Sequence, residues 1–129
     1  MYIKGTFDMT QCMIIGPLGG ESPQLADMLS AYGFDLTSAA NANDALVQCD
    51  NDMPDVIVLP DNLQDMDVVA FIRRLRQSKK GNEAAVFLCA EKADSEQMGR
   101  AIWEGASDFL IEPYDAEVLD RKLKQAGVV

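Results

Sequence analysis

The segment that decides the fold is "PDVIVLPDNLQDMD", residues 54–67. Its apolar run Val56–Leu59 stops at Pro60, which is typical of a short strand buried on both faces. Apolar residues then recur at helical spacing within 67–78, which predicts a helix whose inner face carries Val68, Val69, Ile72 and Leu75. A doubly buried strand followed by an amphipathic helix is the repeating unit of a parallel sheet covered by helices.

The same alternation continues along the rest of the chain. Strands are predicted at 11–16, 34–39, 84–90 and 107–111, and helices at 22–33, 41–50, 94–106 and 115–127. Ser22, Asp94 and Asp115 are placed to cap three of these helices, and Gln97 completes a capping-box pattern with Asp94. Strict alternation predicts one α/β domain over residues 11–129: a flavodoxin-like, doubly wound (βα)5 fold with a five-stranded parallel sheet in three layers. Residues 1–10 form an N-terminal extension. Any site is expected where the strands' carboxyl ends meet, near the first and third strands.

Composition excludes several classes of function. The net charge of −10 opposes binding to nucleic acid. The chain has no histidine, which removes the commonest general base and imidazole metal sites, so we do not expect an enzyme. Its three cysteines are widely spaced and predict neither a disulfide framework nor a zinc cluster. No apolar run reaches the ~20 residues of a membrane span, and the N-terminus lacks a signal-peptide pattern, so a cytoplasmic protein is expected.

Several short motifs carry a family resemblance. They are "GF" at 33–34, "PDVIVL" at 54–59, "MD" at 66–67, "GASDFL" at 105–110 and "EPY" at 112–114. With this strand–helix spacing, the chain resembles the receiver domain of bacterial response regulators, the chemotaxis-type phosphoacceptor module, from about Gln11 to Ala126. The resemblance implies a role in two-component signalling.

The family's chemistry is missing at the matching positions. The resemblance implies an acidic pair after the first strand for Mg²⁺, a phosphoaccepting aspartate ending the third, a serine or threonine ending the fourth, and a lysine before the proline of the fifth. The matching positions are Gly16 with Pro17, then Pro60, Cys89 and Glu112. Proline offers neither a nucleophile nor an N–H, and glutamate repels a phosphoryl group. We therefore expect a pseudo-receiver without Mg²⁺ or other cofactor.

Three alternatives stay open from the sequence. Asp61, one residue beyond the expected acceptor, could be phosphorylated in an atypical geometry. Asp61, Asp65 and Glu112 could gather a divalent cation. The vacated pocket could hold a small molecule, although "GPLGGES" (16–22) has neither the lysine of a P-loop nor the spacing of a dinucleotide loop.

The main interpretation is that the chain is a protein–protein interaction module that does not depend on phosphorylation. Its partner is expected to be a histidine kinase, a phosphotransfer protein, another receiver or a second copy of the chain. Trp103 lies about 140° around its helix from the mean of Met98, Ala101 and Ile102, so it should point outward as an interface anchor or lie flat over its neighbours.

Other surface residues follow from the resemblance and the charge pattern. In receivers the fourth helix, fifth strand and fifth helix form the usual output face, which would take in Phe109 and Tyr114. The cluster Arg73, Arg74 and Arg76 is expected either as a solvated helix end or as a basic docking edge. The resemblance also implies a cis peptide bond before Pro113.

Overall fold

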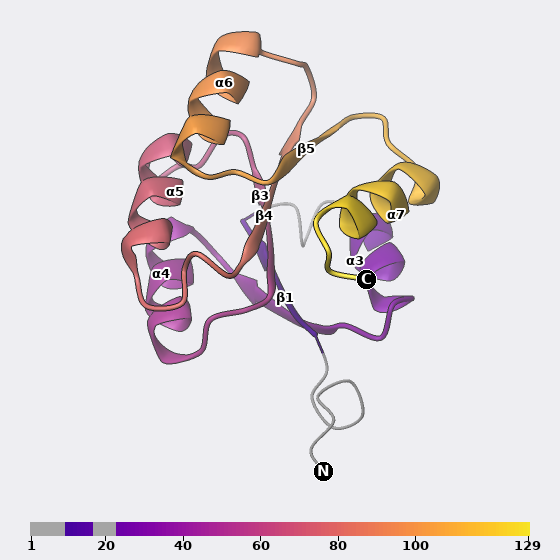
Figure 1. The fold of residues 1–129 in the computed structure, drawn as a ribbon, viewed down its shortest axis with the longest axis horizontal. Helices are drawn as coiled ribbons and strands as arrows, with labels where there is room; N and C mark the ends of the chain where they lie inside the picture. The colour runs from indigo at the N-terminus through magenta and orange to yellow at the C-terminus, as the bar shows by residue number, and fades with distance from the viewer. Residues whose placement is uncertain (1–9, 17–22) are drawn as a thin grey trace.

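A computed structural model describes residues 10–16 and 23–129. Within them the chain alternates strand and helix (Figure 1): β1 Gln11–Ile15, α3 Pro23–Ser30, β2 Asp35–Ala39, α4 Ala42–Asn51, β3 Val56–Pro60, α5 Val68–Gln77, β4 Ala85–Ala90, α6 Ser95–Glu104, β5 Asp108–Ile111 and α7 Ala116–Gln125. The five strands are parallel in the order β2-β1-β3-β4-β5. The predicted flavodoxin-like fold is confirmed. None of the described helices has the length and apolar character needed to cross a membrane.

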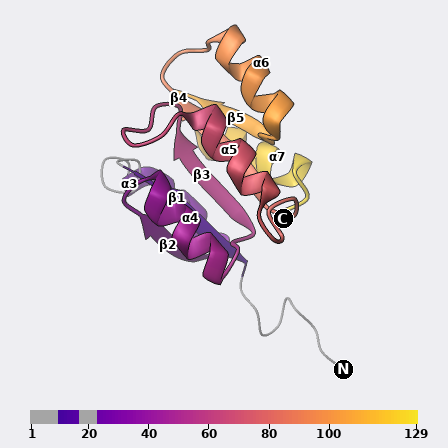
Figure 2. The ribbon, with the colours of Figure 1, turned by 90° about the vertical axis from the view of Figure 1, so that its left-hand side faces the viewer.

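Two apolar clusters, one on each face of the sheet, form the core. Along β3, Ile57 and Leu59 belong to the cluster under α4, α5 and α6, whereas Val56 and Val58 belong to the cluster under α3 and α7. Figure 2 shows α4, α5 and α6 side by side on their face. The alternation of side chains along a strand explains why "VIVL" is apolar throughout, since both faces are covered. The helices that follow β1 and β3 lie on opposite faces, as predicted.

Three helices begin at an aspartate, and the predicted caps at Asp94 and Asp115 are confirmed. Asp67, Asp94 and Asp115 accept hydrogen bonds from backbone N–H groups of the first turns of α5, α6 and α7. Gln97, three residues after Asp94, does not close the predicted capping box. Its side-chain amide donates instead to the Asp61 carbonyl, at 3.0 Å. The helix cap expected at Ser22 lies outside the described residues, as does the N-terminal extension through residue 9.

Arg76 does not lie on an exposed basic edge. Its guanidinium donates to the carbonyls of Gly81, Ala84 and Gly105 at 2.5 to 3.1 Å, which ties the end of α5 to the loop before β4 and to the end of α6. Gly105 has φ 122°, and a Cβ there would come within 2.8 Å of Arg76 Nε. The planar guanidinium suits this role because its donors diverge toward several acceptors at once. Arg76 is therefore a structural brace.

Replacing Arg76 by methionine should lower the free energy of unfolding by roughly 2–3 kcal/mol, because it leaves three part-buried carbonyls without their donor. Urea denaturation monitored by circular dichroism measures the change. Arg74→Met is the matched control: Arg74 is exposed on the same helix and forms no hydrogen bond or ion pair with the described residues, so the change should stay within about 0.5 kcal/mol. An equal decrease in the free energy of unfolding in the two variants would contradict the structural role of Arg76.

Candidate functional site

The carboxyl ends of β1 and β3 meet at the sheet edge where the family resemblance places a site. Gly16 follows β1 with φ 72° and donates to the Ala39 carbonyl at 2.8 Å. A Cβ added to Gly16 would lie 3.7 Å from Pro60 Cγ, so the two residues are neighbours with room for only a small side chain between them. Pro17 lies outside the described residues. Neither Gly16 nor Pro60 has a side-chain oxygen, and this part of the edge is therefore aliphatic.

The end of β4 supplies no hydroxyl group. Cys89 pairs in register with Pro60 and Leu110, and burial raises the pKa of its thiol to about 12. Its Sγ lies 4.0 Å from the hydroxyl of Tyr114. Ala90 is the last residue of the strand, as predicted from the apolar run 84–90. The edge therefore presents a protonated thiol and a methyl group at these positions.

Glu112 follows β5 as an exposed carboxylate, and its backbone N–H donates to the Ala90 carbonyl at 2.8 Å. The peptide bond between Glu112 and Pro113 is cis, as the resemblance implies. Position 112 therefore holds an anion next to the ends of β4 and β5.

Phe109 and Tyr114 do not lie on the outer face expected for them. Phe109 is only 7% exposed and packs in the cluster under α4, α5 and α6. Tyr114 is half-buried against the opposite cluster, under α3 and α7, which also contains Cys89. Phe109 and Cys89 belong to different faces of the sheet, so their side chains do not pack against each other. Both rings contribute to packing.

Asp61, the alternative acceptor, is half-buried among carboxylates. Its N–H donates to the Cys89 carbonyl at 2.9 Å and its own carbonyl accepts from Gln97. Burial raises the pKa of the Asp61 carboxyl, its own backbone N–H lowers it, and the negative charges of Glu91 and Asp94 raise it further. The electrostatic field at this side chain therefore disfavours additional negative charge.

The Asp65 carboxylate accepts hydrogen bonds from the start of helix α4. It accepts from the backbone N–H groups of Ala42 and Asn43, at 3.1 and 2.9 Å, and from the Asn43 side chain at 2.9 Å. These hydrogen bonds, together with the N-cap Asn41, satisfy the start of α4 and lower the pKa of the Asp65 carboxyl. The cation site postulated from Asp61, Asp65 and Glu112 is not assembled: the described residues contain no group of three side chains placed to hold a metal.

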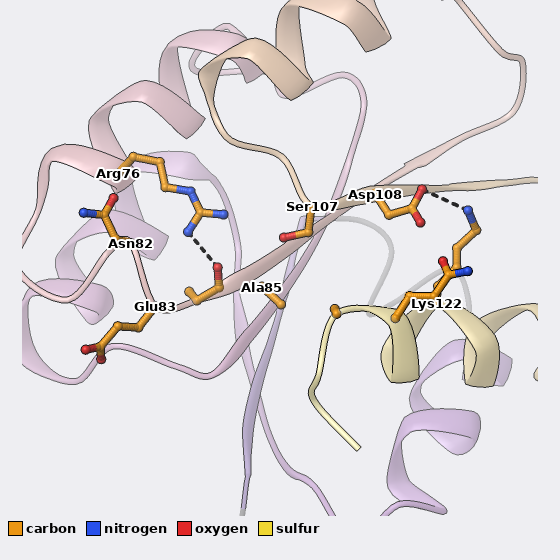
Figure 3. Close-up of a pocket in the computed structure, with 10 residues that line it drawn as sticks. Arg76, Asn82, Glu83, Ala85, Ser107, Asp108 and Lys122 are labelled. Carbon is orange, nitrogen blue, oxygen red and sulfur yellow. Dashed lines mark hydrogen bonds and ion pairs between the residues drawn. The ribbon is translucent and has the colours of Figure 1, made fainter.

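One hollow near this edge lies apart from the vacated acceptor position. It has a volume of about 520 Å³ and lies beside the edge strand β2, lined by Ile14, Gly16, Ala26 and residues 36–40, without Pro60. A second hollow, of about 350 Å³, lies at the opposite, amino ends of β4 and β5 (Figure 3). There Lys122 is paired with Asp108 at 2.9 Å and Arg76 with backbone carbonyls. The Lys122 ammonium and the Arg76 guanidinium, which line this second hollow, are thus already bonded to other groups of the protein.

The outer surface of α6 carries the exposed aromatic residue. Trp103 is 87% exposed, so it points outward. Ile102, expected to point inward, is 48% exposed; that prediction is wrong because β5 is the last strand of the sheet and α6 buries fully only Ala101. On α5, Arg73 and Arg74 are exposed, and Arg73 forms an ion pair with Glu104 at 2.9 Å. The ion pair holds α5 and α6 side by side.

Comparisons with known proteins agree with this architecture. The family model of the response regulator receiver domain matches residues 22–124. The phosphate regulon transcriptional regulatory protein PhoB of Rhizobium meliloti is 22% identical over 74% of this chain and 42% of its own length. An uncharacterized 14.6 kDa protein of Leptolyngbya boryana is 30% identical over 76% of this chain and 75% of its own. The chain thus spans about two fifths of the regulator and three quarters of the smaller protein.

Solved structures show the same fold at low identity. A putative response regulator from Chloroflexus aurantiacus superposes with a TM-score of 0.83 at 20% identity, over 92% of this chain and 98% of that one. The chemotaxis response regulator CheY4 of Vibrio cholerae gives 0.80 at 19% identity, with the same two coverages.

Replacing Asp65 by asparagine should lower the thermal midpoint, because the first turn of α4 loses a charged acceptor. The pKa of Asp65 is depressed in the folded state, so its contribution is present above the ordinary aspartate pKa of about 3.9 and is lost as pH falls through the lower folded value. Differential scanning fluorimetry from neutral pH to about pH 3 should show the difference between wild type and variant shrinking.

Asp27→Asn, an exposed change on α3, is the control and should leave the midpoint nearly unchanged at every pH. A midpoint difference for Asp65→Asn that stays constant through the acid range would contradict the role of the ionised carboxylate.

Proposed function

Since the chain belongs to the family of response regulator receiver domains, we propose that it is a pseudo-receiver: a two-component signalling domain that binds proteins without being phosphorylated and is not itself an enzyme. The observation that carries this proposal is that Gly16 and Pro60 are neighbours at the carboxyl edge, where a receiver needs carboxylates. Four features of the edge support it.

First, the edge offers no nucleophile and no ligands for a hard cation at the acceptor position. An acyl phosphate requires a carboxylate, and Pro60 has none. Magnesium prefers near-octahedral oxygen coordination, and Gly16 and Pro60 contribute no side-chain oxygen. The residues present therefore do not fit Mg²⁺, and no step of the proposed function involves it.

Second, the groups that would steady a phosphoryl anion are replaced by groups that do not. A buried thiol with a pKa of about 12 is a weak hydrogen-bond donor, and Ala90 at the strand end has no donor in its side chain. Glu112 brings a negative charge to the position where the family has a lysine. Its exposure weakens the repulsion by solvent screening but leaves the sign unchanged.

Third, the surroundings of Asp61 disfavour it as a substitute acceptor. A phosphoryl group adds a charge of about −1.5 to −2 near neutral pH. At Asp61 this charge would lie near Glu91 and Asp94, which already raise the pKa of the carboxyl. Phosphorylation at Asp61, the second candidate function, is therefore opposed mainly by repulsion between the phosphoryl group and these two carboxylates.

Fourth, the segment after β3 is held at several points. The Asp61 N–H bonds to β4, its carbonyl to α6 through Gln97, and the Asp65 carboxylate to the start of α4. A loop with these attachments favours one arrangement of the neighbouring helices over a switch between two. A constant surface suits an interaction that does not depend on phosphorylation.

The surface proposed for binding consists of Trp103 and Ile102 on α6 with the exposed Arg73 and Arg74 on α5. Tryptophan and arginine are enriched among residues that contribute most to binding. A histidine kinase, a phosphotransfer protein, another receiver or a second copy of the chain is the kind of partner proposed. Arg76, Phe109 and Tyr114 are left out because the fold uses them internally.

The test is incubation with a small phosphodonor and Mg²⁺ followed by intact mass spectrometry. We expect no gain of a phosphate on the wild-type chain, under conditions in which an authentic receiver in the same tube gains one. Asp61→Asn is the matched variant and should give the same spectrum as wild type. A phosphate adduct on wild type that is absent from Asp61→Asn would contradict the pseudo-receiver and would support phosphorylation at Asp61.

A further inference from the structure

The hollow at the amino ends of β4 and β5 lies at the opposite end of the sheet from the carboxyl edge (Figure 3). Its walls come from both faces of the sheet, because Arg76 reaches it from α5 and Lys122 from α7. Ser107, which precedes β5, lies between these two side chains. The volume of about 350 Å³ falls within the usual range of small-molecule pockets. The hollow shares no residue with the carboxyl edge and is a separate feature of the domain.

Arg76 brings an uncompensated positive charge to one wall of this hollow. Its hydrogen bonds go to the backbone carbonyls of Gly81, Ala84 and Gly105, which carry no net charge. No carboxylate among the described residues forms an ion pair with it, and burial alone lowers the pKa of the guanidinium. These bonds use four of the five N–H groups of a guanidinium, so one on Nη2 stays available. A part-buried cation of this kind favours a nearby anion.

Ser107 and Lys122 supply further donors. Ser107 Oγ accepts from the Val86 N–H at 2.9 Å, which fixes the oxygen and leaves the hydroxyl proton to be donated. Figure 3 shows the Ser107 side chain and the Arg76 guanidinium directed toward each other. Lys122 donates to Asp108 at 2.9 Å, and an ammonium group has three N–H groups, so two remain. Three side chains from different elements therefore offer donors to one hollow.

Two carboxylates also line the hollow, and neither blocks the approach of an anion. Asp108 is paired with Lys122, so its charge is compensated. Glu83 is exposed, and Figure 3 shows its carboxylate pointing away from the Arg76 guanidinium. The two cations and two anions of the lining cancel, whereas the whole chain carries −10. An anion is therefore repelled less here than over most of the surface.

We propose that this hollow binds a small polar molecule carrying a phosphate or carboxylate group, whose oxygens accept from Lys122, Ser107 and the remaining N–H of Arg76. Phosphate and carboxylate share the required chemistry, since both accept charge-assisted hydrogen bonds from ammonium and guanidinium groups. The rest of the ligand is polar, because the exposed amides of Asn82 and Gln125 border the hollow. This site goes beyond the proposed function and does not depend on it.

The test is an NMR titration of the ¹⁵N-labelled full chain with inorganic phosphate and, separately, with succinate. The amide signals of Ala85, Ser107 and Asp108 should shift saturably with at least one probe, and sodium chloride at the same ionic strength should leave them in place. The probe that binds more tightly distinguishes a phosphate ligand from a carboxylate ligand. Both probes are smaller than the hollow, so a dissociation constant in the millimolar range is expected.

Two substitutions should change the affinity in opposite directions. Lys122→Gln should raise the dissociation constant at least about 10-fold, because a charge-assisted hydrogen bond to the anion is lost. Asp108→Asn should lower it roughly 2- to 5-fold, because Lys122 is released while the asparagine oxygen still accepts from the Phe109 N–H. Lys124→Gln is the matched control: it makes the same charge change on the same helix, but Lys124 pairs with Asp120 and does not line the hollow.

The site would be overturned if neither probe shifted the three amides of the folded chain saturably. Equal weakening in Lys122→Gln and Lys124→Gln would overturn it as well, since the effect would then follow net charge alone. A folded Asp108→Asn that binds no more tightly than wild type would also contradict the arrangement. None of these outcomes bears on phosphorylation, which is tested at the other end of the sheet.

Discussion

The convergence of the parallel strands β1 and β3 places Gly16 beside Pro60, and we propose that these two residues decide the chemistry of the carboxyl edge. In a doubly wound sheet the carboxyl ends of the strands converge, so the residues that end β1 and β3 face one another whatever their chemistry. With glycine and proline there, the topology still brings the strand ends together, but it assembles an aliphatic surface. The fold and the site are therefore independent: strand alternation and helix packing specify the first, and a few terminal residues specify the second.

The same edge is joined to the outer helices by backbone-directed hydrogen bonds. Gln97 links the Asp61 carbonyl to the first turn of α6, and Asp65 links the loop after β3 to α4. At the other end of α6, Arg76 bonds to the Gly105 carbonyl and Arg73 to Glu104. These polar contacts link both ends of α6 to the rest of the domain. Of these residues only Arg73 also belongs to the surface proposed for binding.

Periodicity predicted the sheet, the layers and the helix starts at Asp94 and Asp115, because buried strands and amphipathic helices leave strong patterns. It also predicted that Trp103 points outward. It failed where a side chain's role is decided by non-local partners. Arg76 looks like its neighbours in "RRLR", but its acceptors come from other segments of the chain. Ile102 was misplaced because only the tertiary arrangement shows that the sheet ends at β5. The hydrogen bonds of Gln97 to the Asp61 carbonyl and of Asp65 to the start of α4 could not be predicted either, because each joins residues far apart in the sequence. Gln97 was recognised only as part of a capping pattern.

The family resemblance predicted which positions differ from those of a phosphorylated receiver, and the strand predicted over residues 84–90 ends at Ala90 as expected. The most direct measurement of the central claim is an NMR titration of the ¹⁵N-labelled chain with beryllofluoride and Mg²⁺, which together mimic a phosphoryl group on a receiver. The account predicts that the amide signals of Gly16, Asp61, Gln97 and Glu112 keep their positions throughout. Saturable shifts at these amides, absent with either component alone, would contradict it.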